Sequence, residues 1–196
     1  KITKKEMRGV PHHLLDIDTP KNKFNVAEYK ELAEKKIVEI ISRSKIPIIC
    51  GGTGFYIDAV TSGVVFPEVP PNLKLRRTLD KKSVSELLKI LKKLDKVRAK
   101  NIDANNKVRL VRAIEIARHL GKVPSLTIQK PTYQFIKIGL YLSQAELKKK
   151  VEKRVKGMFN SGLLNEIRKL KKTGITDKRL RELGFEYFKP TIESVV

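Results

Sequence analysis

The segment Gly51–Thr53 could place a hydroxyl group beside an open stretch of backbone. It reads GGT and follows an apolar run, Pro47–Cys50, that is typical of a strand buried in a parallel sheet. A plain strand-to-helix turn needs at most one glycine, so two in a row suggest that the backbone approaches something closely and that Thr53 points at it. The alternative is a tight turn in which Thr53 caps a helix. The residue types leave both interpretations open.

A second feature with chemical potential is the pair Arg109 and Arg112 in the segment NNKVRLVRAIEIARHLGK. On a helix the two guanidinium groups stand about one turn apart on a common face, which suits phosphates or stacked bases. The neighbouring core stripe is expected to consist of Leu110, Val111, Ile114 and Ala117. A surface pair that serves only solubility is the alternative.

Other catalytic patterns are weak or missing. His12 and His13 are adjacent and lack ligand spacing with the single cysteine, Cys50, so no metal site is predicted. With Asp16 the two histidines could be catalytic, but a structural pair at a strand end explains them equally well. No GxxxxGK[ST] loop that would cradle a phosphate occurs in the sequence.

The elements that position these residues begin with an amphipathic helix. Apolar periodicity predicts a helix over Val26–Ser44, with a capping box formed by Asn25 and Glu28. Another helix is expected over Gly54–Thr61. Together with the Pro47–Cys50 strand, this order of helix, buried strand, glycine turn and helix predicts an α/β fold.

The proline-rich segment FPEVPPN, residues 66–72, marks the clearest boundary in the chain. Short basic helices are predicted after it: Leu73–Leu79, one capped by Ser83 and Glu86, and Asn105–Leu120. We expect residues 1–70 to form part of a core, residues 71–130 a helical insertion, and residues 131–196 a return to the core.

The third region is predicted to contain a strand followed by basic helices. In Phe135–Leu142, apolar and other residues first alternate and the sequence then becomes continuously apolar, which is typical of a strand. Ser143 and Glu146 are expected to cap the next helix. Its predicted buried stripe is Leu147, Val151, Val155 and Met158, and another basic helix is expected after Gly162.

Composition limits the class of protein. The chain has 196 residues, 40% of them apolar, which is enough for a folded core. No apolar run approaches the roughly 18 residues of a membrane span, and there is no signal-peptide pattern. A lone cysteine excludes internal disulfides and fits a reducing compartment. We therefore expect a cytoplasmic protein that does not enter membranes.

The net charge of +22 is concentrated after residue 70. Residues 1–70 have 11 basic and 9 acidic side chains, whereas residues 71–196 have 32 basic and 12 acidic ones. This distribution is typical of a globular core joined to a surface that binds a polyanion. Ordinary solvated helix faces in a lysine-rich chain are the alternative.

Five segments resemble one known family in their order along the chain. They are GVPHHLLDI, IPIICGGTGFYIDAV, NNKVRLVRAIE, KRVKGMFNSGLLNEI and RELGFEYF, which extend from about Gly9 to Phe188. The chain resembles the IPP transferases, the tRNA dimethylallyltransferases. The resemblance implies a P-loop NTPase-like parallel-sheet core, incomplete here, with a tRNA-binding helical insertion. It also implies transfer of a dimethylallyl group from dimethylallyl diphosphate to the N6 amine of the adenosine beside the anticodon.

The resemblance gives the GGT segment a role. Thr53 would lie at the carboxyl end of a core strand, facing the channel where the base meets the prenyl donor. There its hydroxyl would orient the target adenosine by a hydrogen bond and would not act as a nucleophile. Gly51 and Gly52 would leave room for the nucleotide.

The resemblance also assigns the basic residues to substrate binding. Arg109 matches a position near the tRNA and the active site, and Arg112 would be a second contact on the same helix. Arg154 matches an arginine expected to reach the substrate or its diphosphate. Lys74 or Arg76 would touch the RNA backbone at the entrance of the insertion.

The implied partners are the tRNA anticodon arm and dimethylallyl diphosphate, with Mg²⁺ as cofactor and its ligands largely outside this chain. We expect a monomer. Because the chain starts with Lys1, it reads as a piece of a longer protein. The family's P-loop and its aspartate base would precede Lys1, and an arginine-rich segment would follow Val196. We therefore expect these residues alone to bind diphosphate poorly and not to catalyse.

Two other interpretations remain open. One is a non-catalytic, basic RNA-binding module derived from the same family. The other is a small-molecule P-loop kinase, which shares the core fold but gives no reason for the basic charge after residue 70.

Overall fold

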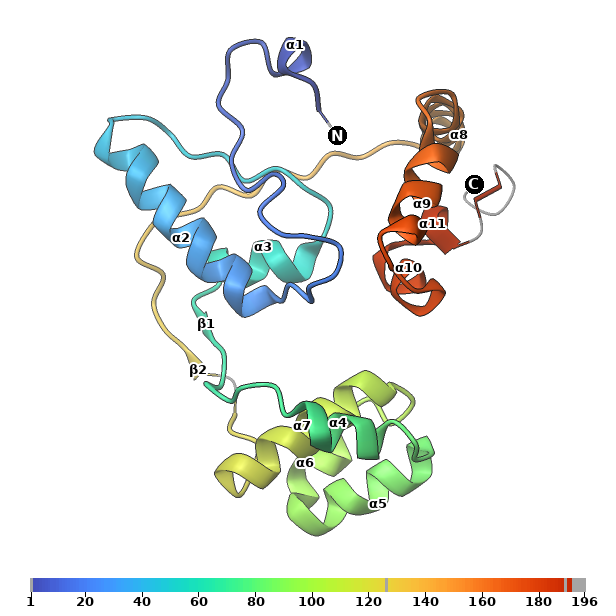
Figure 1. The fold of residues 1–196 in the computed structure, drawn as a ribbon. Helices are drawn as coiled ribbons and strands as arrows, with labels where there is room; N and C mark the ends of the chain where they lie inside the picture. The colour runs from blue at the N-terminus through green and yellow to red at the C-terminus, as the bar shows by residue number, and fades with distance from the viewer. Residues whose placement is uncertain (1, 126, 189, 192–196) are drawn as a thin grey trace. The chain divides into compact units, whose positions relative to one another are not determined.

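The fold is given by a computed structural model that describes residues 2–125, 127–188 and 190–191. The chain divides into two compact units (Figure 1). Unit 1 combines residues 1–50 with residues 134–196, and unit 2 consists of residues 51–133. The domain limits expected at residues 70 and 130 stay predictions.

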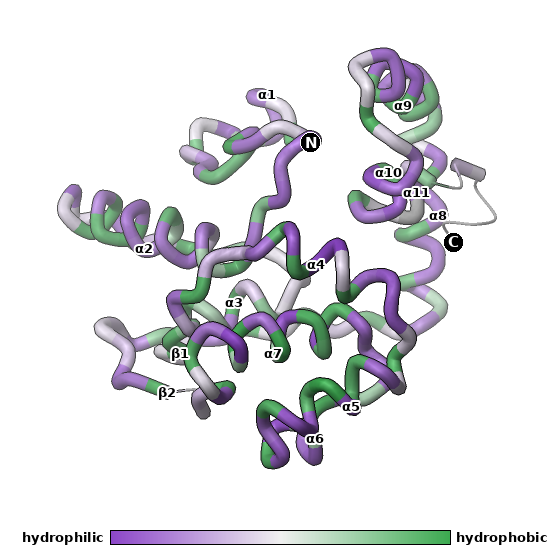
Figure 2. Tube along the Cα trace, turned by 60° about the horizontal axis from the view of Figure 1, so that its bottom comes forward, coloured by the Kyte–Doolittle hydropathy of each residue, from purple (hydrophilic) through white to green (hydrophobic). Residues whose placement is uncertain are grey.

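The first part of unit 1 contains α1 (Lys4–Met7) and α2 (Val26–Ser42). The predicted capping box starts α2: Asn25 Oδ1 accepts from the Glu28 N–H, and the Glu28 carboxylate accepts from the Asn25 N–H. Hydrophobic and polar residues alternate along α2 (Figure 2), and its buried residues are Ala33 and Ile37. The helix predicted from periodicity is therefore confirmed, two residues shorter than expected.

The second part of unit 1 is helical and has its own core. Its elements are α8 (Gln144–Asn160), α9 (Leu163–Lys172), α10 (Asp177–Leu183) and α11 (Phe185–Phe188). The buried cluster consists of Leu163, Ile167, Ile175 and Leu180. The predicted capping box of Ser143 and Glu146 is confirmed. The predicted burial of Leu147 is wrong, since Val155 is the buried residue of α8 and Leu147 is exposed near its first turn.

Unit 2 is built of short helices, and all of them except the first pack around one apolar cluster. Its helices are α3 (Gly54–Thr61), α4 (Leu73–Leu79), α5 (Val84–Leu94), α6 (Lys96–Asn101) and α7 (Lys107–Leu120). The cluster consists of Leu79, Leu87, Leu91, Ala99, Ile102, Leu110, Val111, Ala113 and Ile114. The helices expected in this region are confirmed, and α7 contributes the largest share of the cluster.

A short antiparallel pairing in unit 2 was not predicted. Strand β1 (Val64–Val65) pairs with β2 (Thr127–Ile128), so the chain segments before and after the helices α4–α7 meet. Gly63 is required beside this pairing because its φ is 65° and an added Cβ would lie 1.9 Å from the Gln129 carbonyl oxygen.

The two strands predicted in unit 1 are not formed in the described residues. Pro47–Cys50 and Phe135–Leu142 belong to no helix or strand, and Ile48 and Ile138 are 84% and 82% exposed. A strand needs a neighbour to pair with its N–H and C=O groups, and no described segment supplies one. The structure is thus helix-rich with a two-stranded sheet, and it does not show the expected parallel core. Among the described residues, no helix is both long and apolar enough to cross a membrane.

Candidate functional site

Thr53 presents a free hydroxyl at the start of α3. It occupies the N-cap position, as the tight-turn interpretation expects, but its side chain makes no capping hydrogen bond. Its Oγ1 has no hydrogen-bond partner in the described part of the chain, and the residue is exposed. A hydroxyl in this state can donate to or accept from a ligand.

The neighbouring glycines are not explained by the fold. Neither Gly51 nor Gly52 has a positive φ, and a Cβ added at either would meet nothing within 4 Å. Turn geometry and packing in the described residues therefore do not require glycine at these positions. Together with Thr53 they form an open corner where a ligand could approach the backbone.

Glu115 is the centre of a buried ionic cluster in unit 2. Its side chain is only 2% exposed. It accepts hydrogen bonds from Nε and Nη2 of Arg76 at 2.9 and 2.7 Å, from the N–H of Asn72 at 2.6 Å, and from Nη1 of Arg112 at 2.5 Å. Because Asn72 and Arg76 belong to the start of α4 and Arg112 to α7, this one carboxylate joins the two helices.

These contacts determine the charge state of Glu115. Burial raises the pKa of the carboxyl, but the hydrogen bonds from Arg76, the Asn72 N–H and Arg112 outweigh it and lower the pKa to about 2. The carboxylate is therefore ionised at neutral pH. The cluster of one carboxylate and two guanidinium groups keeps a net positive charge, and both arginines remain partly exposed.

The other predicted contacts in unit 2 are more open. Arg109 is 65% exposed, and its nearest carboxylate, on Asp103, lies 3.9 Å away. Lys74 is exposed on α4 and makes no ion pair within the described residues. These two side chains are free to reach an external anion, whereas Arg76 and Arg112 are held by Glu115.

Arg154 belongs to α8 of unit 1, not to the unit that carries Thr53 and Arg109. It is exposed and has no ion-pair partner in the described part of the chain. The expectation that these side chains converge on one channel stays a prediction.

Sequence reasoning missed Glu115. A signal was present: the residue interrupts the apolar run Ala113–Ala117 of α7, and Arg112 precedes it by three residues. A charged residue in a buried stripe needs a partner, which points to a buried ion pair.

A cavity of about 170 Å³ lies beside Glu115 and is lined also by Arg118 and His119. It is smaller than the roughly 300–1,000 Å³ of usual ligand sites.

Possible metal ligands are not clustered among the residues that the structure describes. No cluster of three or more His, Cys, Asp or Glu side chains that could hold an ion occurs among the described residues. The Mg²⁺ that the resemblance implies, with ligands largely outside this chain, stays a prediction, and no step is assigned to it here.

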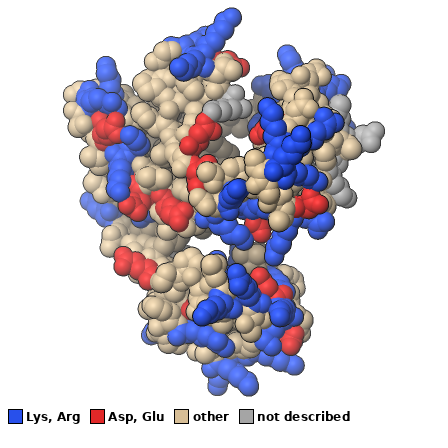
Figure 3. Space-filling model, viewed as in Figure 1, with Lys and Arg blue, Asp and Glu red and all other residues tan. Residues whose placement is uncertain are grey.

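Basic side chains are distributed differently over two helices of unit 1. Figure 3 shows basic residues gathered over the C-terminal helices, whereas acidic and basic residues alternate over α2. On α2 the pairs Lys35–Glu31 and Lys36–Glu39 lie at 2.6 and 2.5 Å. None of the basic residues on α8 has such a partner in the part of the chain that the structure describes: Lys148, Lys149, Lys150, Lys153, Arg154 and Lys156.

Comparison with known proteins gives a consistent result. A family model described as IPP transferase matches residues 1–195. A tRNA dimethylallyltransferase of Anoxybacillus flavithermus is 36% identical over 191 residues, which cover 95% of this chain and 61% of the relative. One of Leuconostoc citreum is 36% identical over 197 residues, covering 100% and 66%. The chain thus spans about two thirds or less of the length of these relatives.

Solved structures of proteins with related names also match this chain. The full-length tRNA isopentenylpyrophosphate transferase of Bacillus halodurans has a TM-score of 0.57 and 35% identity, covering 90% of this chain and 57% of that protein. A eukaryotic dimethylallyltransferase acting on tRNA has a TM-score of 0.71 at 23% identity, covering 92% of this chain and 48% of that protein. The second likeness shows a shared fold.

Proposed function

This chain belongs to the IPP transferase family, and we propose that it serves to transfer a dimethylallyl group from dimethylallyl diphosphate to N6 of the adenosine next to the tRNA anticodon. The observation that carries the proposal is the family match, which extends over residues 1–195. The free Thr53 hydroxyl beside Gly51 and Gly52 supports it, because a base and a prenyl donor need an open corner with a positioning group.

The reaction forms one bond and breaks another. The N6 nitrogen attacks the allylic carbon, the carbon–oxygen bond to diphosphate breaks, and the nitrogen gives up a proton to a base. Adenine's amine is a poor nucleophile, so its orientation toward the allylic carbon supplies much of the catalysis. We assign that orientation to a hydrogen bond with Thr53, while Arg154 would contact the substrate or the departing diphosphate.

RNA binding would come from exposed basic residues that are not held in the buried cluster around Glu115. Arg109 and Lys74 are exposed and would contact the phosphate backbone. Arg112 and Arg76 would contribute through the parts of their guanidinium groups that Glu115 does not occupy. The target adenosine must leave its stack to reach the donor, which requires a firm hold on the anticodon arm.

The proposal includes a P-loop-like parallel core. The apolar segments Pro47–Cys50 and Phe135–Leu142 would become strands of that core when another strand pairs with them. These 196 residues contain no phosphate-cradling loop of the GxxxxGK[ST] type. By themselves they should therefore bind dimethylallyl diphosphate weakly and transfer no prenyl group.

A chimera tests the activity. This chain would replace the matched region of the A. flavithermus relative, and the product would be incubated with tRNA, dimethylallyl diphosphate and Mg²⁺. Mass spectrometry of the digested tRNA should detect N6-dimethylallyladenosine from the chimera and none from the 196-residue chain. A folded chimera that binds tRNA but forms no product would instead support the non-catalytic RNA-binding alternative.

A further inference from the structure

None of the six basic residues of α8 forms an ion pair in the described part of the chain. The helix contains two carboxylates: Glu146 is used in the capping box with Ser143, and Glu152 makes no ion pair in the described residues. Like charges three and four residues apart destabilise a helix, and Lys149 and Lys153 have this spacing. Helix α8 therefore carries a repulsion that an external polyanion would relieve.

Three of these lysines line one groove. Lys149, Lys153 and Lys156 recur every three to four residues, so they follow one side of α8, and Asn160 continues the same row. The groove has a volume of about 470 Å³. The buried Val155 lies on another side of the helix, so the lysine row faces away from the packed side.

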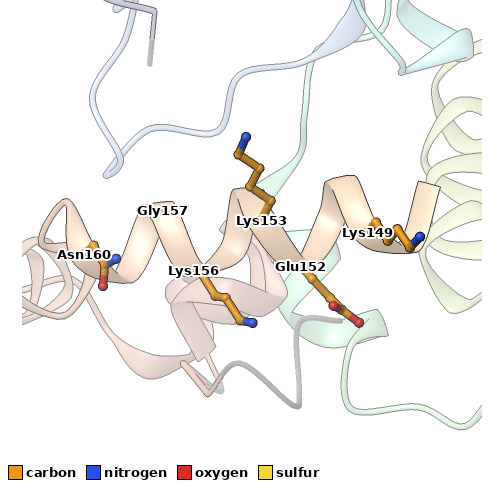
Figure 4. Close-up of a pocket in the computed structure, with 6 residues that line it drawn as sticks. All are labelled: Lys149, Glu152, Lys153, Lys156, Gly157 and Asn160. Carbon is orange, nitrogen blue, oxygen red and sulfur yellow. The ribbon is translucent and has the colours of Figure 1, made fainter. Parts of the chain in front are cut away.

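The geometry of the groove leaves the helix backbone open. Figure 4 shows the lining side chains along α8, with Gly157 between Lys156 and Asn160. Gly157 does not have a positive φ, and a Cβ added there would meet nothing within 4 Å. Glycine in a helix interior is unfavourable relative to alanine, so neither conformation nor packing in the described residues explains it. A ligand that approaches the backbone closely would explain it.

We propose that this α8 groove, formed by Lys149, Glu152, Lys153, Lys156, Gly157 and Asn160, binds the phosphate backbone of the tRNA substrate. The inference rests on the proposed function. Lysine ammonium groups bind phosphates as point charges, and the Asn160 amide can donate to phosphate or ribose oxygens. Glu152 reduces the charge of the groove and leaves it positive by two.

Two other partners fit less well. An anionic membrane surface would require apolar side chains on the same face as the lysines, and none lines the groove. A merely solvated helix face would be expected to resemble α2, where Lys35, Lys36 and Arg43 each lie within 4 Å of a glutamate.

The test compares two triple variants of the 196-residue chain. Lys149→Gln, Lys153→Gln and Lys156→Gln remove three charges from the groove. Lys35→Gln, Lys36→Gln and Arg43→Gln remove the same charge from α2. Affinity for a fluorescent anticodon stem-loop would be measured by anisotropy over a series of salt concentrations. The groove variant should lose roughly tenfold or more in affinity, and its slope of log K against log salt should fall by about 2.

The α2 variant should lose no more than about threefold, because its charges are already neutralised within the protein. Equal losses in both variants would overturn the proposal, since they would report net charge alone. Loss of binding to phosphatidylserine vesicles without loss of RNA binding would also overturn it. If the unmodified chain binds no anticodon stem-loop, the proposed tRNA function itself fails. If the unmodified chain binds the stem-loop and the groove variant binds it equally tightly, only this inference fails.

Gly157→Ala provides a second, independent readout. Alanine should raise the melting temperature by about 2–4 °C because it favours the helix. It should also weaken stem-loop binding several-fold, because a methyl group would then occupy the open part of the groove. A stabilised variant that binds RNA as tightly as the unmodified chain would overturn the role of this groove.

Discussion

Arg76 and Glu115, which are 39 residues apart in the chain, meet in a two-point ion pair with Nε and Nη2 at 2.9 and 2.7 Å from the carboxylate oxygens. The contact joins α4 to α7 at a position where the glutamate is almost fully buried. Because the same carboxylate also holds Arg112, the contact fixes two of the predicted RNA-binding arginines relative to each other. Stability and RNA binding should therefore be linked in unit 2.

Replacing Glu115 by glutamine should destabilise the protein. The variant keeps the shape of the side chain but leaves Arg76 and Arg112 without their counter-charge, so the free energy of unfolding should fall by about 2–3 kcal/mol. Urea unfolding followed by circular dichroism measures it. Glu31→Gln is the matched control, since Glu31 forms an exposed ion pair with Lys35 and its replacement should leave stability nearly unchanged. Equal losses would show that the buried cluster does not stabilise unit 2.

Stability should depend on pH through the same carboxyl. Its pKa is about 2 in the folded chain, below the ordinary value of 4.5. The unfolded chain therefore binds the proton more readily, and the stabilisation is complete above pH 4.5 and lost as pH falls from about 4.5 to about 2. The stability difference between the unmodified chain and Glu115→Gln should shrink by roughly half or more between pH 7 and pH 3. A difference that stays constant over this range would contradict the lowered pKa.

Helix starts were predictable because their contacts are local. Asn25 with Glu28, Ser83 with Glu86, and Ser143 with Glu146 each form the capping box expected from the sequence. Each box depends on residues three positions apart and on nothing else in the fold. The strands were not predictable in the same way, because pairing depends on distant segments. Pro47–Cys50 has the apolar pattern without a partner, and β1 is too short to give a pattern.

The sequence indicated which residues are candidates for the site, but it did not indicate which residues they contact. The hydroxyl of Thr53 is free and the guanidinium of Arg109 is exposed, and their roles in substrate binding stay predictions. The resemblance places Arg76 at the entrance of the insertion, but no local sequence pattern predicts its partner on α7. Contacts of this kind depend on how helices pack, which a basic run does not specify.

Arg109 and Arg112 should respond differently to substitution. Arg109→Ala should weaken binding of the anticodon stem-loop by about 1–3 kcal/mol and leave unfolding nearly unchanged, because the side chain is exposed. Arg112→Ala should lower both quantities, since it also removes a partner of Glu115. Arg98→Ala, on the exposed side of α6, controls for the loss of one charge. If Arg98→Ala and Arg109→Ala weaken binding equally, the loss is explained by net charge and not by a specific contact of Arg109.

The unpaired apolar segments should be visible in amide hydrogen exchange. Residues 46–50 and 135–142 have mostly exposed side chains and no strand pairing in the described structure, so their amides should exchange within seconds in the 196-residue chain. In the chimera, where the missing strands are proposed to pair with them, exchange should slow by several orders of magnitude. The amides of α5 serve as an internal reference, because its side chains Leu87 and Leu91 are fully buried in the core of unit 2. Fast exchange of both segments in an active chimera would contradict the proposed parallel core.

Thr53 should affect the reaction without affecting the fold. Its hydroxyl has no partner in the described residues, so Thr53→Ala should leave the melting temperature of the chimera within a degree or so. The same change should lower kcat/KM for tRNA by roughly tenfold to a hundredfold, the usual effect of removing one substrate hydrogen bond. Thr53→Ser keeps the hydroxyl and should retain most of the activity. If serine and alanine reduce kcat/KM equally, the methyl group of threonine matters instead of the hydroxyl, and the hydrogen bond to adenosine is excluded.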